Sequence, residues 1–422
     1  MNTKDFIRLG IPLGKATWRA TDFVSKFVLA GGDKTRLVEE VKAIIANPSS
    51  FLEDSMRGEF AKALLNAPPP PRTEPIKYRQ WGEGLEHEAV MQMEKACLLP
   101  VAVAGALMPD AHVGYGLPIG GVLATEDTVI PYAVGVDIAC RMKMTVLDIP
   151  ARDLEHHQDR AWSQLGTSGS GNHFVEFGLF TAHGNIRGLE PGTYLALLSH
   201  SGSRGTGAAV CDHYSKLAFR QFPDLPSELK RLAWLSLDSQ EGQEYWAAME
   251  LMGRYAAANH ALIHKHVAAN LGAEVLLDLE NHHNFAWKER HVINGVEREV
   301  IVHRKGATPA GQGVLGIIPG SMASPGIVVS GKGNPESLNS ASHGAGRVMS
   351  RTQASKTFEW KKVNAFLREK GVTLISAGLD EVPMVYKNIH EVMAAQQDLV
   401  TILGQFDPKL VKMAPHGERA ED

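Results

Sequence analysis

Five short segments of the chain carry residues that can bind metal ions or phosphate groups. They are residues 135–141, 169–176, 199–205, 281–286 and 342–347. Histidine, cysteine and aspartate ligate transition metals, and the glycines in four of these segments let a backbone approach a bound ligand closely. If the segments converge in the fold, they predict a site that combines metal ions with phosphate chemistry.

In the first segment, Asp137 and Cys140 stand three residues apart after an apolar stretch. A turn would bring the carboxylate and the thiolate close to one point, where they could bind a metal, and a thiolate can bridge two metal ions. The alternative is an aspartate that caps a helix beside a buried cysteine. Local spacing leaves both interpretations open.

Two further segments place a histidine beside a polar loop. Asn172, His173 and Glu176 follow the loop at 169–171 and supply an amide, an imidazole and a carboxylate. His200 follows an apolar stretch, which predicts a place at the end of a strand, and Arg204 beyond it offers a guanidinium for phosphate. The alternatives are a hydrogen-bonded histidine at a loop exit and a polar turn whose histidine is solvated.

The fourth segment contains two adjacent histidines, His282 and His283. Adjacent side chains point in different directions on any regular element, so at most one of them is expected to face a shared site. The chain has neither an HExxH pattern nor paired CxxC motifs, which excludes the usual zinc-protease and zinc-finger patterns.

The fifth segment presents His343 among small residues on a glycine-rich loop beside Arg347. A histidine in this setting suits nucleophilic attack on phosphorus. The loops at 319–322 and 331–334 could cradle a triphosphate through backbone N–H groups, although the chain has neither a Walker loop nor a Rossmann phosphate-binding pattern. The alternative for the loop of His343 is a flexible surface turn.

The rest of the sequence predicts the elements that must hold these segments. Helices are predicted at residues 34–46, 85–99, 227–271 and 389–406. Ser227, after a proline, is the expected N-cap of the third helix. Short apolar runs at 193–198 and 326–329 alternate with polar turns and predict strands. The fold class expected from these patterns is mixed α/β.

Changes in composition and hydrophobic pattern along the sequence divide the chain into four parts. We expect a helical N-terminal extension at 1–66, a Pro-rich linker at 67–84, a catalytic domain at 85–412 and a frayed tail at 413–422. Glycine-rich loops run from 108 to 347 without a linker between them. This continuity favours one large catalytic domain with a central metal and nucleotide cleft.

Composition narrows the class of protein. Of 422 residues, 44% are hydrophobic and 21% are charged, which is typical of a globular chain with a large core. Three cysteines cannot form a disulfide framework and the N-terminus lacks a signal-peptide pattern, so we expect a soluble, cytoplasmic protein. The net charge is −4, but residues 281–362 hold 11 Lys and Arg against 5 Asp and Glu. This basic segment could attract the phosphates of RNA, or it could be a scatter of solvated charges.

The order of the motifs resembles that of one family, the RtcB RNA-splicing ligases. The resemblance begins with MPDAHVGYG at 108–116 and PIG at 118–120. It continues through GVDIAC, GNHFVE, HSGSRG, HNFA, HRKGAT, PGSM and SHGAGR, in the order that the family has them. It covers the chain from about 85 to about 396 and leaves the first 66 residues unmatched.

The resemblance implies a GTP- and Mn(II)-dependent RNA ligase that joins a 3′-phosphate or 2′,3′-cyclic phosphate end to a 5′-hydroxyl end, in RNA repair or tRNA splicing. In the family, the histidine that matches His343 attacks the α-phosphorus of GTP and carries GMP as a phosphoramidate. GMP then passes to the RNA 3′-phosphate, and the 5′-hydroxyl displaces it. The route is chemically reasonable because a phosphate is a poor electrophile until it gains a leaving group. It leaves open which RNA is joined, the oligomeric state and whether an activating protein takes part.

Matched residue by residue, the resemblance gives the catalytic role to His343. Cys140 would bridge two metal ions, and His173 would complete one of the two sites. The other site would be completed by Asp137, His200 and His283. The residues expected around the nucleotide are Asn172, Phe174, Glu176, Asn284, Pro319, Gly320, Ser321, Met322, Gly344, Ala345, Gly346 and Lys412. Glu176 is the candidate for reading guanine. Thiolate and imidazole donors favour Zn(II) over Mn(II), so the choice of Mn(II) rests on the resemblance, and zinc could occupy the site in the isolated protein.

The chain departs from the family pattern at three places. The bridging cysteine is flanked by Ala139 and Arg141, where the family has two glycines. The family's serine after PGSM corresponds to Gly326 or, with a shift, to Ser324. Ten residues follow Lys412, whereas the family usually ends near the matching lysine. These departures bear on guanine selectivity more than on the metal site or the nucleophile.

Two other functions are compatible with the same motifs. One is another metal-dependent nucleotidyltransferase that caps 3′-phosphate ends on the same scaffold. The second is an RNA-binding protein without catalytic activity. The presence of every proposed ligand together with His343 argues against a protein that only binds.

Overall fold

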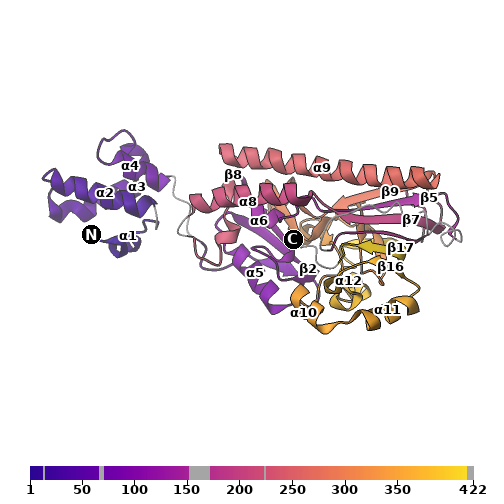
Figure 1. Ribbon diagram of the computed structural model, residues 1–422. Coiled ribbons are helices and arrows are strands. Elements are labelled where there is room, and N and C mark those ends of the chain that lie inside the picture. The colour runs from indigo at the N-terminus through magenta and orange to yellow at the C-terminus, as the bar shows by residue number, and fades with distance from the viewer. Residues whose placement is uncertain (13–14, 66–70, 152–171, 223–224, 416–422) are drawn as a thin grey trace.

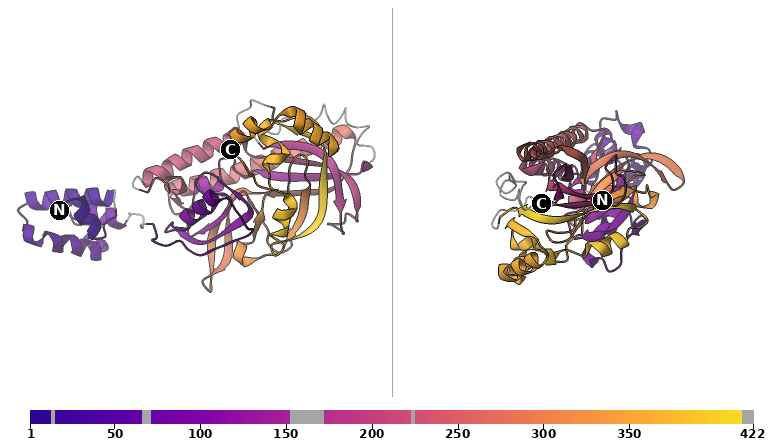
Figure 2. Two further views of the ribbon diagram at one scale, coloured as in Figure 1. Left: turned by 90° about the horizontal axis from the view of Figure 1, so that it is seen from below. Right: turned by 90° about the vertical axis from the view of Figure 1, so that its right-hand side faces the viewer.

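The structure is a computed structural model of the 422-residue chain. It describes all residues except 13–14, 66–70, 152–171, 223–224 and 416–422. A group of N-terminal helices lies apart from a larger body of two large β-sheets, two two-stranded sheets and covering helices (Figures 1 and 2). Among the described helices, none is both long enough and apolar enough to cross a lipid bilayer.

The N-terminal helices have a hydrophobic core of their own. They are α1 (Thr3–Arg8), α2 (Lys15–Leu29), α3 (Leu37–Ala46) and α4 (Gly58–Leu65). Phe6, Phe23, Ile44 and Phe60 meet at the centre of this group and are almost fully buried. The helix predicted at 34–46 is confirmed as a short 3-10 turn followed by α3, and it ends before Pro48.

The first sheet has five strands. In spatial order they are β1 (Tyr78–Gln80), β2 (Ala102–His112), β3 (Ile119–Thr125), β11 (Val296–Lys305) and β10 (Asn284–Ile293). The helix predicted at 85–99 is confirmed as α5 (His87–Cys97), which packs on β2. The range expected to be a linker, 67–84, contains β1 near its C-terminal end. Tyr78 pairs with Gly105, so the backbone groups of this segment are satisfied at the edge of β2.

The second sheet contains most of the strands near the site. Its main path is β13 (Leu315–Ile318), β14 (Gly326–Gly331), β17 (Val400–Met413), β6 (Phe174–Ala182), β7 (Gly192–Ser201), β5 (Arg141–Leu147) and β9 (Val275–His282). β16 (Thr373–Ser376) pairs with β17 outside this path. The strands predicted at 193–198 and 326–329 are confirmed as parts of β7 and β14.

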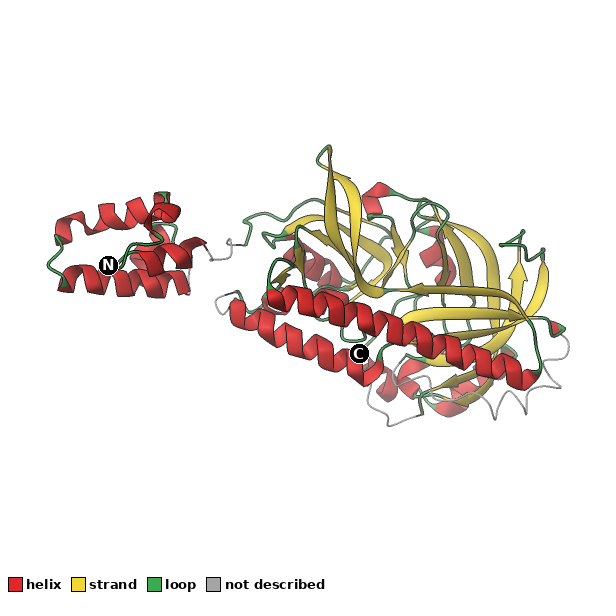
Figure 3. Ribbon diagram, turned by 90° about the horizontal axis from the view of Figure 1, so that it is seen from above, coloured by secondary structure: helices red, strands yellow, loops and turns green. Residues whose placement is uncertain are grey.

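Two long helices, α8 (Arg204–Gln221) and α9 (Gln240–Leu271), pack along each other beside the sheets (Figure 3). The prediction of one helix from Ser227 is wrong by 13 residues at its start. Ser239 is the N-cap of α9, and its hydroxyl accepts a hydrogen bond from the backbone N–H of Gly242. The preceding segment instead forms β8 (Leu235–Ser236), which pairs with β4 (Thr128–Val129), because its apolar residues are buried there.

Three shorter helices follow in the C-terminal part: α10 (Arg351–Thr357), α11 (Trp360–Glu369) and α12 (Ile389–Ala394). The helix predicted at 389–406 is correct only for its first turns. From Val400 the chain is β17, which lies between β14 and β6 and pairs with both. Long-range pairing therefore decides the conformation of this apolar stretch, as it commonly does for β-strands. The tail predicted from 413 lies largely outside the described residues.

The register of the second sheet brings four strand ends together. Arg141, the first residue of β5, pairs with Ser201 at the end of β7 and with His282 at the end of β9. Phe174, the first residue of β6, pairs with His200. The segments immediately before β5 and β6 and immediately after β9 therefore lie at one edge of the sheet, together with the last residues of β7.

Candidate metal and nucleotide site

The proposed metal ligands meet at this edge of the second sheet. Cys140 precedes β5, His173 precedes β6, His200 lies near the end of β7 and His283 follows β9. The backbone ties two of these segments together, since the N–H of His283 donates to the carbonyl oxygen of Cys140 over 3.0 Å. All four side chains are almost completely buried. The expectation that only one of the adjacent histidines faces the site is met by His283.

The donor atoms form two groups that share Cys140. One group contains Cys140, His200 and His283, and the other contains Asp137, Cys140 and His173. The sequence-based expectation that Asp137 joins His200 and His283 is therefore wrong. Asp137 Oδ2 lies 2.9 Å from His173 Nε2, because the loop before β5 turns the carboxylate toward the start of β6.

The first group points its donor atoms at one another. His200 Nε2 lies 3.0 Å from Cys140 Sγ and 3.1 Å from His283 Nε2. The other ring nitrogen of His200, Nδ1, donates to the carbonyl oxygen of Asn172 over 3.1 Å, which leaves a lone pair on Nε2. Burial lowers the pKa of His200 to about 3, so the ring is neutral near pH 7. A neutral imidazole and a thiolate with converging lone pairs fit a soft or borderline cation.

The second group contains a buried carboxylate oxygen without a hydrogen-bond partner in the described part of the chain. Asp137 Oδ1 is buried and has no hydrogen-bond partner among the described residues. Burial alone would raise the pKa of Asp137, but the charge and hydrogen bond of His173 bring it below its usual value. Gly202 makes room for this carboxylate, since a Cβ at that position would lie 2.1 Å from Asp137 Oδ1. A buried, ionised carboxylate with one oxygen atom left without a hydrogen bond fits a cation ligand.

His343 stands next to these groups, at the end of β15 (Ser340–Ser342), which pairs with β12 (Ala307–Pro309). The centroid of its ring lies 4.9 Å from that of His283. Its Nδ1 atom lies 2.7 Å from Asp110 Oδ2, which also accepts from the backbone N–H groups of His343 and Gly344. With Nδ1 bound to Asp110, Nε2 is the ring nitrogen that can act as a nucleophile.

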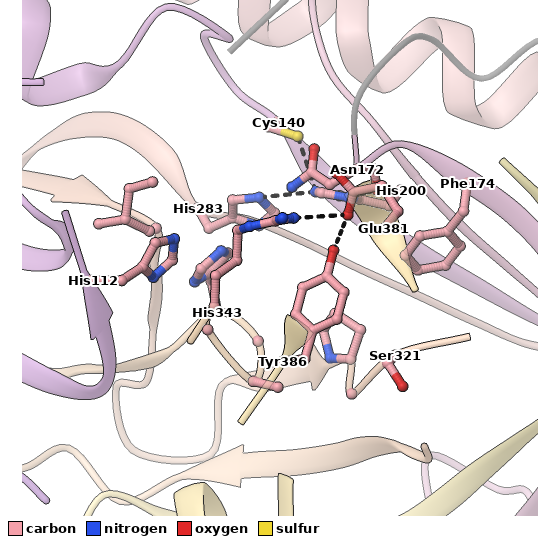
Figure 4. Close-up of a pocket in the computed structure, with 18 of the residues that line it drawn as sticks. His112, Cys140, Asn172, Phe174, His200, His283, Ser321, His343, Glu381 and Tyr386 are labelled. Atoms are coloured by element: carbon pink, nitrogen blue, oxygen red, sulfur yellow. Dashed lines mark hydrogen bonds and ion pairs between the residues drawn. The ribbon is translucent and has the colours of Figure 1, made fainter. Parts of the chain in front are cut away.

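A cavity of about 480 Å³ opens beside His343 (Figure 4). Eleven of the twelve residues expected around the nucleotide line it: Asn172, Phe174, Glu176, Asn284, Pro319, Gly320, Ser321, Met322, Gly344, Ala345 and Gly346. The twelfth, Lys412, is not among the residues that line the cavity. Val411 and Met413 line the cavity, and successive side chains of a strand alternate between its faces, so Lys412 is directed to the opposite face of β17.

The family model described as tRNA-splicing ligase RtcB matches residues 92–160 and 150–413. The chain belongs to the RtcB family. It is similar to the RNA-splicing ligase RtcB of Escherichia coli, with 30% identity over 406 residues that cover 78% of this chain and 96% of the relative. It is also similar to the tRNA-splicing ligase RtcB of Archaeoglobus fulgidus, with 30% identity over 72% of this chain and 86% of the relative. The RNA-splicing ligase RtcB of Mycobacterium tuberculosis is 31% identical over 72% of this chain and 95% of its own length.

The RtcB-family match begins at residue 92, so α1 to α4 lie outside it. Within the match, local sequence patterns do not predict the partner of His343. Asp110 belongs to the MPDAHVGYG motif, but the motif alone indicates no role for it. Burial alone would raise the pKa of Asp110, yet the hydrogen bond and charge of His343 lower it. An acidic residue directly after the apolar run of β2 was the available signal, since such a residue is rarely buried without a partner.

A second missed group closes the cavity from the C-terminal part. Glu381 accepts hydrogen bonds from Arg347 over 3.1 Å and from Arg351 and Tyr386 (Figure 4). Burial raises the pKa of Glu381, and the two arginines act in the opposite direction. All four residues line the cavity. Of these, only Arg347 stands in a recognisable motif, and no local pattern in the sequence marks Glu381 or Tyr386.

Proposed function

We propose that this chain is an RNA ligase that joins RNA 3′-phosphate or 2′,3′-cyclic phosphate ends to 5′-hydroxyl ends, using GTP and two Mn(II) ions. The observation that carries the proposal is the setting of His343. One of its ring nitrogens is bound to Asp110, and His343 lines the same glycine-rich cavity as Cys140, His200 and His283. The relatives named RNA-splicing ligases support the reaction class.

In the proposed reaction, His343 Nε2 attacks the α-phosphorus of GTP, an N–P bond forms and pyrophosphate leaves. The RNA 3′-phosphate then attacks the same phosphorus, so that GMP moves to the RNA and the N–P bond breaks. Finally the 5′-hydroxyl oxygen attacks the activated 3′-phosphorus and GMP leaves. The carboxylate of Asp110 holds the Nδ1 proton and offsets the positive charge that develops on the ring during the first step.

The proposed metal ligands are Asp137, Cys140 and His173 for one ion and Cys140, His200 and His283 for the other. When bound, the two ions neutralise phosphate charge and help to orient or deprotonate the attacking groups. These ligands combine a soft thiolate, imidazoles of intermediate softness and a hard carboxylate. By ligand chemistry alone, the set suits Zn(II) better than Mn(II). Activity after reconstitution with each metal separately tests the choice.

Glu176 is the proposed guanine-reading residue. It lines the cavity, it is almost fully buried, and burial raises its pKa well above the usual value. A carboxyl group held in an apolar wall gains most from a ligand that offers it N–H donors, as the edge of guanine does. We expect Glu176→Gln to narrow the difference between GTP and ATP in labelling of the protein, because the amide replaces one acceptor oxygen by an NH2 donor that would face an N–H group of guanine.

The experiment that tests the proposal is incubation with α-labelled GTP and Mn(II), followed by denaturing electrophoresis. The protein should acquire a covalent label that His343→Ala removes and that His390→Ala, on an exposed position of α12, retains. No label on the wild-type protein, or a label that survives His343→Ala, would overturn it.

Addition of RNA separates the ligase from the other functions. A 2′,3′-cyclic-phosphate RNA and a 5′-hydroxyl RNA should give a joined product. A product that stops at a guanylylated 3′ end would identify a capping nucleotidyltransferase. RNA binding with neither a labelled protein nor a modified RNA would identify a protein that only binds.

A further inference from the structure

The loop after β2 carries an exposed tyrosine at the rim of the cavity. Tyr115 lines the cavity, and 52% of its surface is exposed. A single exposed aromatic residue is common on protein surfaces and needs no function by itself. Its setting suggests more, because hydrogen bonds hold the backbone on both sides of Tyr115 while about half of the residue's surface stays exposed.

Side chains of α5 and its N-cap hold the first part of the loop. The carboxylate of Glu86 accepts a hydrogen bond from the backbone N–H of Val113 over 3.0 Å. The amide of Gln92 makes two hydrogen bonds to Gly114, accepting from its N–H over 3.0 Å and donating to its carbonyl oxygen over 2.7 Å. The loop is therefore fixed up to the residue before Tyr115.

The second part of the loop is held from beneath and from the side. The Nζ atom of Lys305, a buried residue of β11, donates to the carbonyl oxygens of Tyr115 and Tyr132. Gly116 has φ +77°, and a Cβ there would lie 3.0 Å from the carbonyl oxygen of Arg231. The close approach that glycine allows brings the guanidinium of Arg231 over the ring of Tyr115, 4.5 Å from its centroid.

Tyr115 belongs to the loop that follows His112, a residue that lies away from the proposed nucleotide contacts. β2 ends at His112, three residues before Tyr115. Figure 4 shows His112 on one side of His343 and Phe174 and Ser321 on the other. A nucleotide against Phe174 and the loop at 319–322 would leave the His112 side of the cavity for a second ligand that must also reach His343.

We propose that Tyr115, backed by Arg231, is a stacking platform for an unpaired base next to an RNA end. This inference rests on the proposed function, since it assumes that the second ligand is RNA. A base on the open part of the ring would extend the stack of guanidinium and tyrosine, and the positive charge of Arg231 would favour the adjacent phosphate. Because the loop is fixed before binding, little ordering would oppose the contact.

The test measures binding of single-stranded RNA to the full-length protein by fluorescence anisotropy, without GTP. Tyr115→Leu keeps an apolar side chain of similar size, and Tyr115→Phe is the matched control that keeps the ring. Tyr115→Leu should weaken RNA binding between about five-fold and about a hundred-fold, and Tyr115→Phe should bind as the wild type does. Equal affinity of Tyr115→Leu and wild type would overturn the platform, as would an equal loss in both variants.

An RNA that lacks its terminal base provides the second arm. If the base stacks on Tyr115, its removal should weaken binding to the wild type and have no further effect on Tyr115→Leu, since the contact is already absent. Additive losses would overturn the proposal. One RNA lacks the base at a 3′-phosphate end and a second lacks it at a 5′-hydroxyl end, so the arm that shows the non-additive loss identifies the strand.

The result is distinguishable from failure of the proposed function. Covalent labelling with GTP does not require RNA, so both variants should label as the wild type does. If the wild type is not labelled but Tyr115→Leu still weakens RNA binding as expected, the proposed ligase is refuted and the stacking platform stands. If the wild type is labelled but Tyr115→Leu binds RNA as the wild type does, the platform is refuted and the ligase stands.

Discussion

Two groups of buried histidines lie on opposite faces of β7, and their ring nitrogens have different surroundings. On one face, His200 meets Cys140 and His283, and the donor atoms point at one another. On the other face, two histidines of α9, His260 and His264, contact the side chain of Ser199, the neighbour of His200 in the strand. Alternation along one strand thus separates a proposed metal site from a structural network.

In the network on the second face, every ring nitrogen has a partner. His260 Nε2 donates to the carbonyl oxygen of Ser201 over 3.1 Å, and its Nδ1 lies 3.1 Å from Ser199 Oγ. His264 Nε2 lies 2.8 Å from the same hydroxyl, and its Nδ1 lies 2.7 Å from Thr145 Oγ1. The partners of this pair are hydroxyl and carbonyl groups of the chain.

The comparison shows which property distinguishes the two groups. Burial lowers the pKa of His200 and of His260 to about 3, so a depressed pKa is common to both faces. What differs is the partner. The α9 pair meets hydroxyl and carbonyl groups, whereas His200 meets a cysteine and a second histidine, which are side chains that commonly ligate metal ions.

Among the variants that test the difference between the two faces of β7, Cys140→Ala is expected to have the largest effect. Its sulfur belongs to both proposed metal groups, so both ions and the covalent GMP label should be lost. Metal content by mass spectrometry and labelling with GTP measure the two losses. Cys97→Ala, at a buried cysteine of α5, is the matched control and should keep both. A Cys140→Ala protein with full metal content would show that the sulfur is not a shared ligand.

A more selective effect is expected from Gly202→Ala. The added Cβ would lie 2.1 Å from Asp137 Oδ1 and would displace a carboxylate that belongs to only one group. We expect one of the two ions to be lost while the ion of Cys140, His200 and His283 is retained. Gly205→Ala is the control, because a Cβ there meets no atom within 4 Å. Equal metal content in the two variants would contradict the grouping of Asp137 with His173.

His264→Ala tests the other face of β7. It removes one hydrogen-bond partner from each of the Ser199 and Thr145 hydroxyls and opens a cavity, which should lower the free energy of unfolding by about 2–4 kcal/mol. Metal content should not change. His283→Ala should show the reverse pattern, with loss of metal and a smaller loss of stability in EDTA. Denaturant unfolding with and without EDTA measures both, and a metal loss in His264→Ala would end the distinction between the faces.

The last effect concerns pH. The pKa of His260 falls from 6.5 to about 3 on folding because of burial, so the unfolded state binds the proton first as the pH drops. The contribution to stability is complete above about pH 6.5 and declines toward pH 3, with a slope of about 1.4 kcal/mol per pH unit for one proton. His260→Gln should therefore lose stability less steeply between pH 6.5 and 4 in EDTA. Parallel curves for wild type and variant would contradict this.

Local patterns predicted the elements whose periodicity is strong. The helix at 34–46 and the strand at 193–198 are found where the apolar spacing placed them. The prediction failed at 389–406, where an apolar stretch suits a helix and a buried strand equally. There the pairing of β17 with β14 and β6 decides for a strand, and local spacing contains no information about those partners.

The sequence by itself determined the types of donor atom and the order of the motifs, which are those of the RtcB family. Only the tertiary structure decided that Asp137 lies with His173, that Lys412 is directed away from the cavity and that Asp110 holds His343 across 233 positions of the chain. The physical reason is the same in each case. Spacing along the chain sets local periodicity, whereas the face that a side chain occupies and the residue that it meets depend on sheet register, which distant strands fix together.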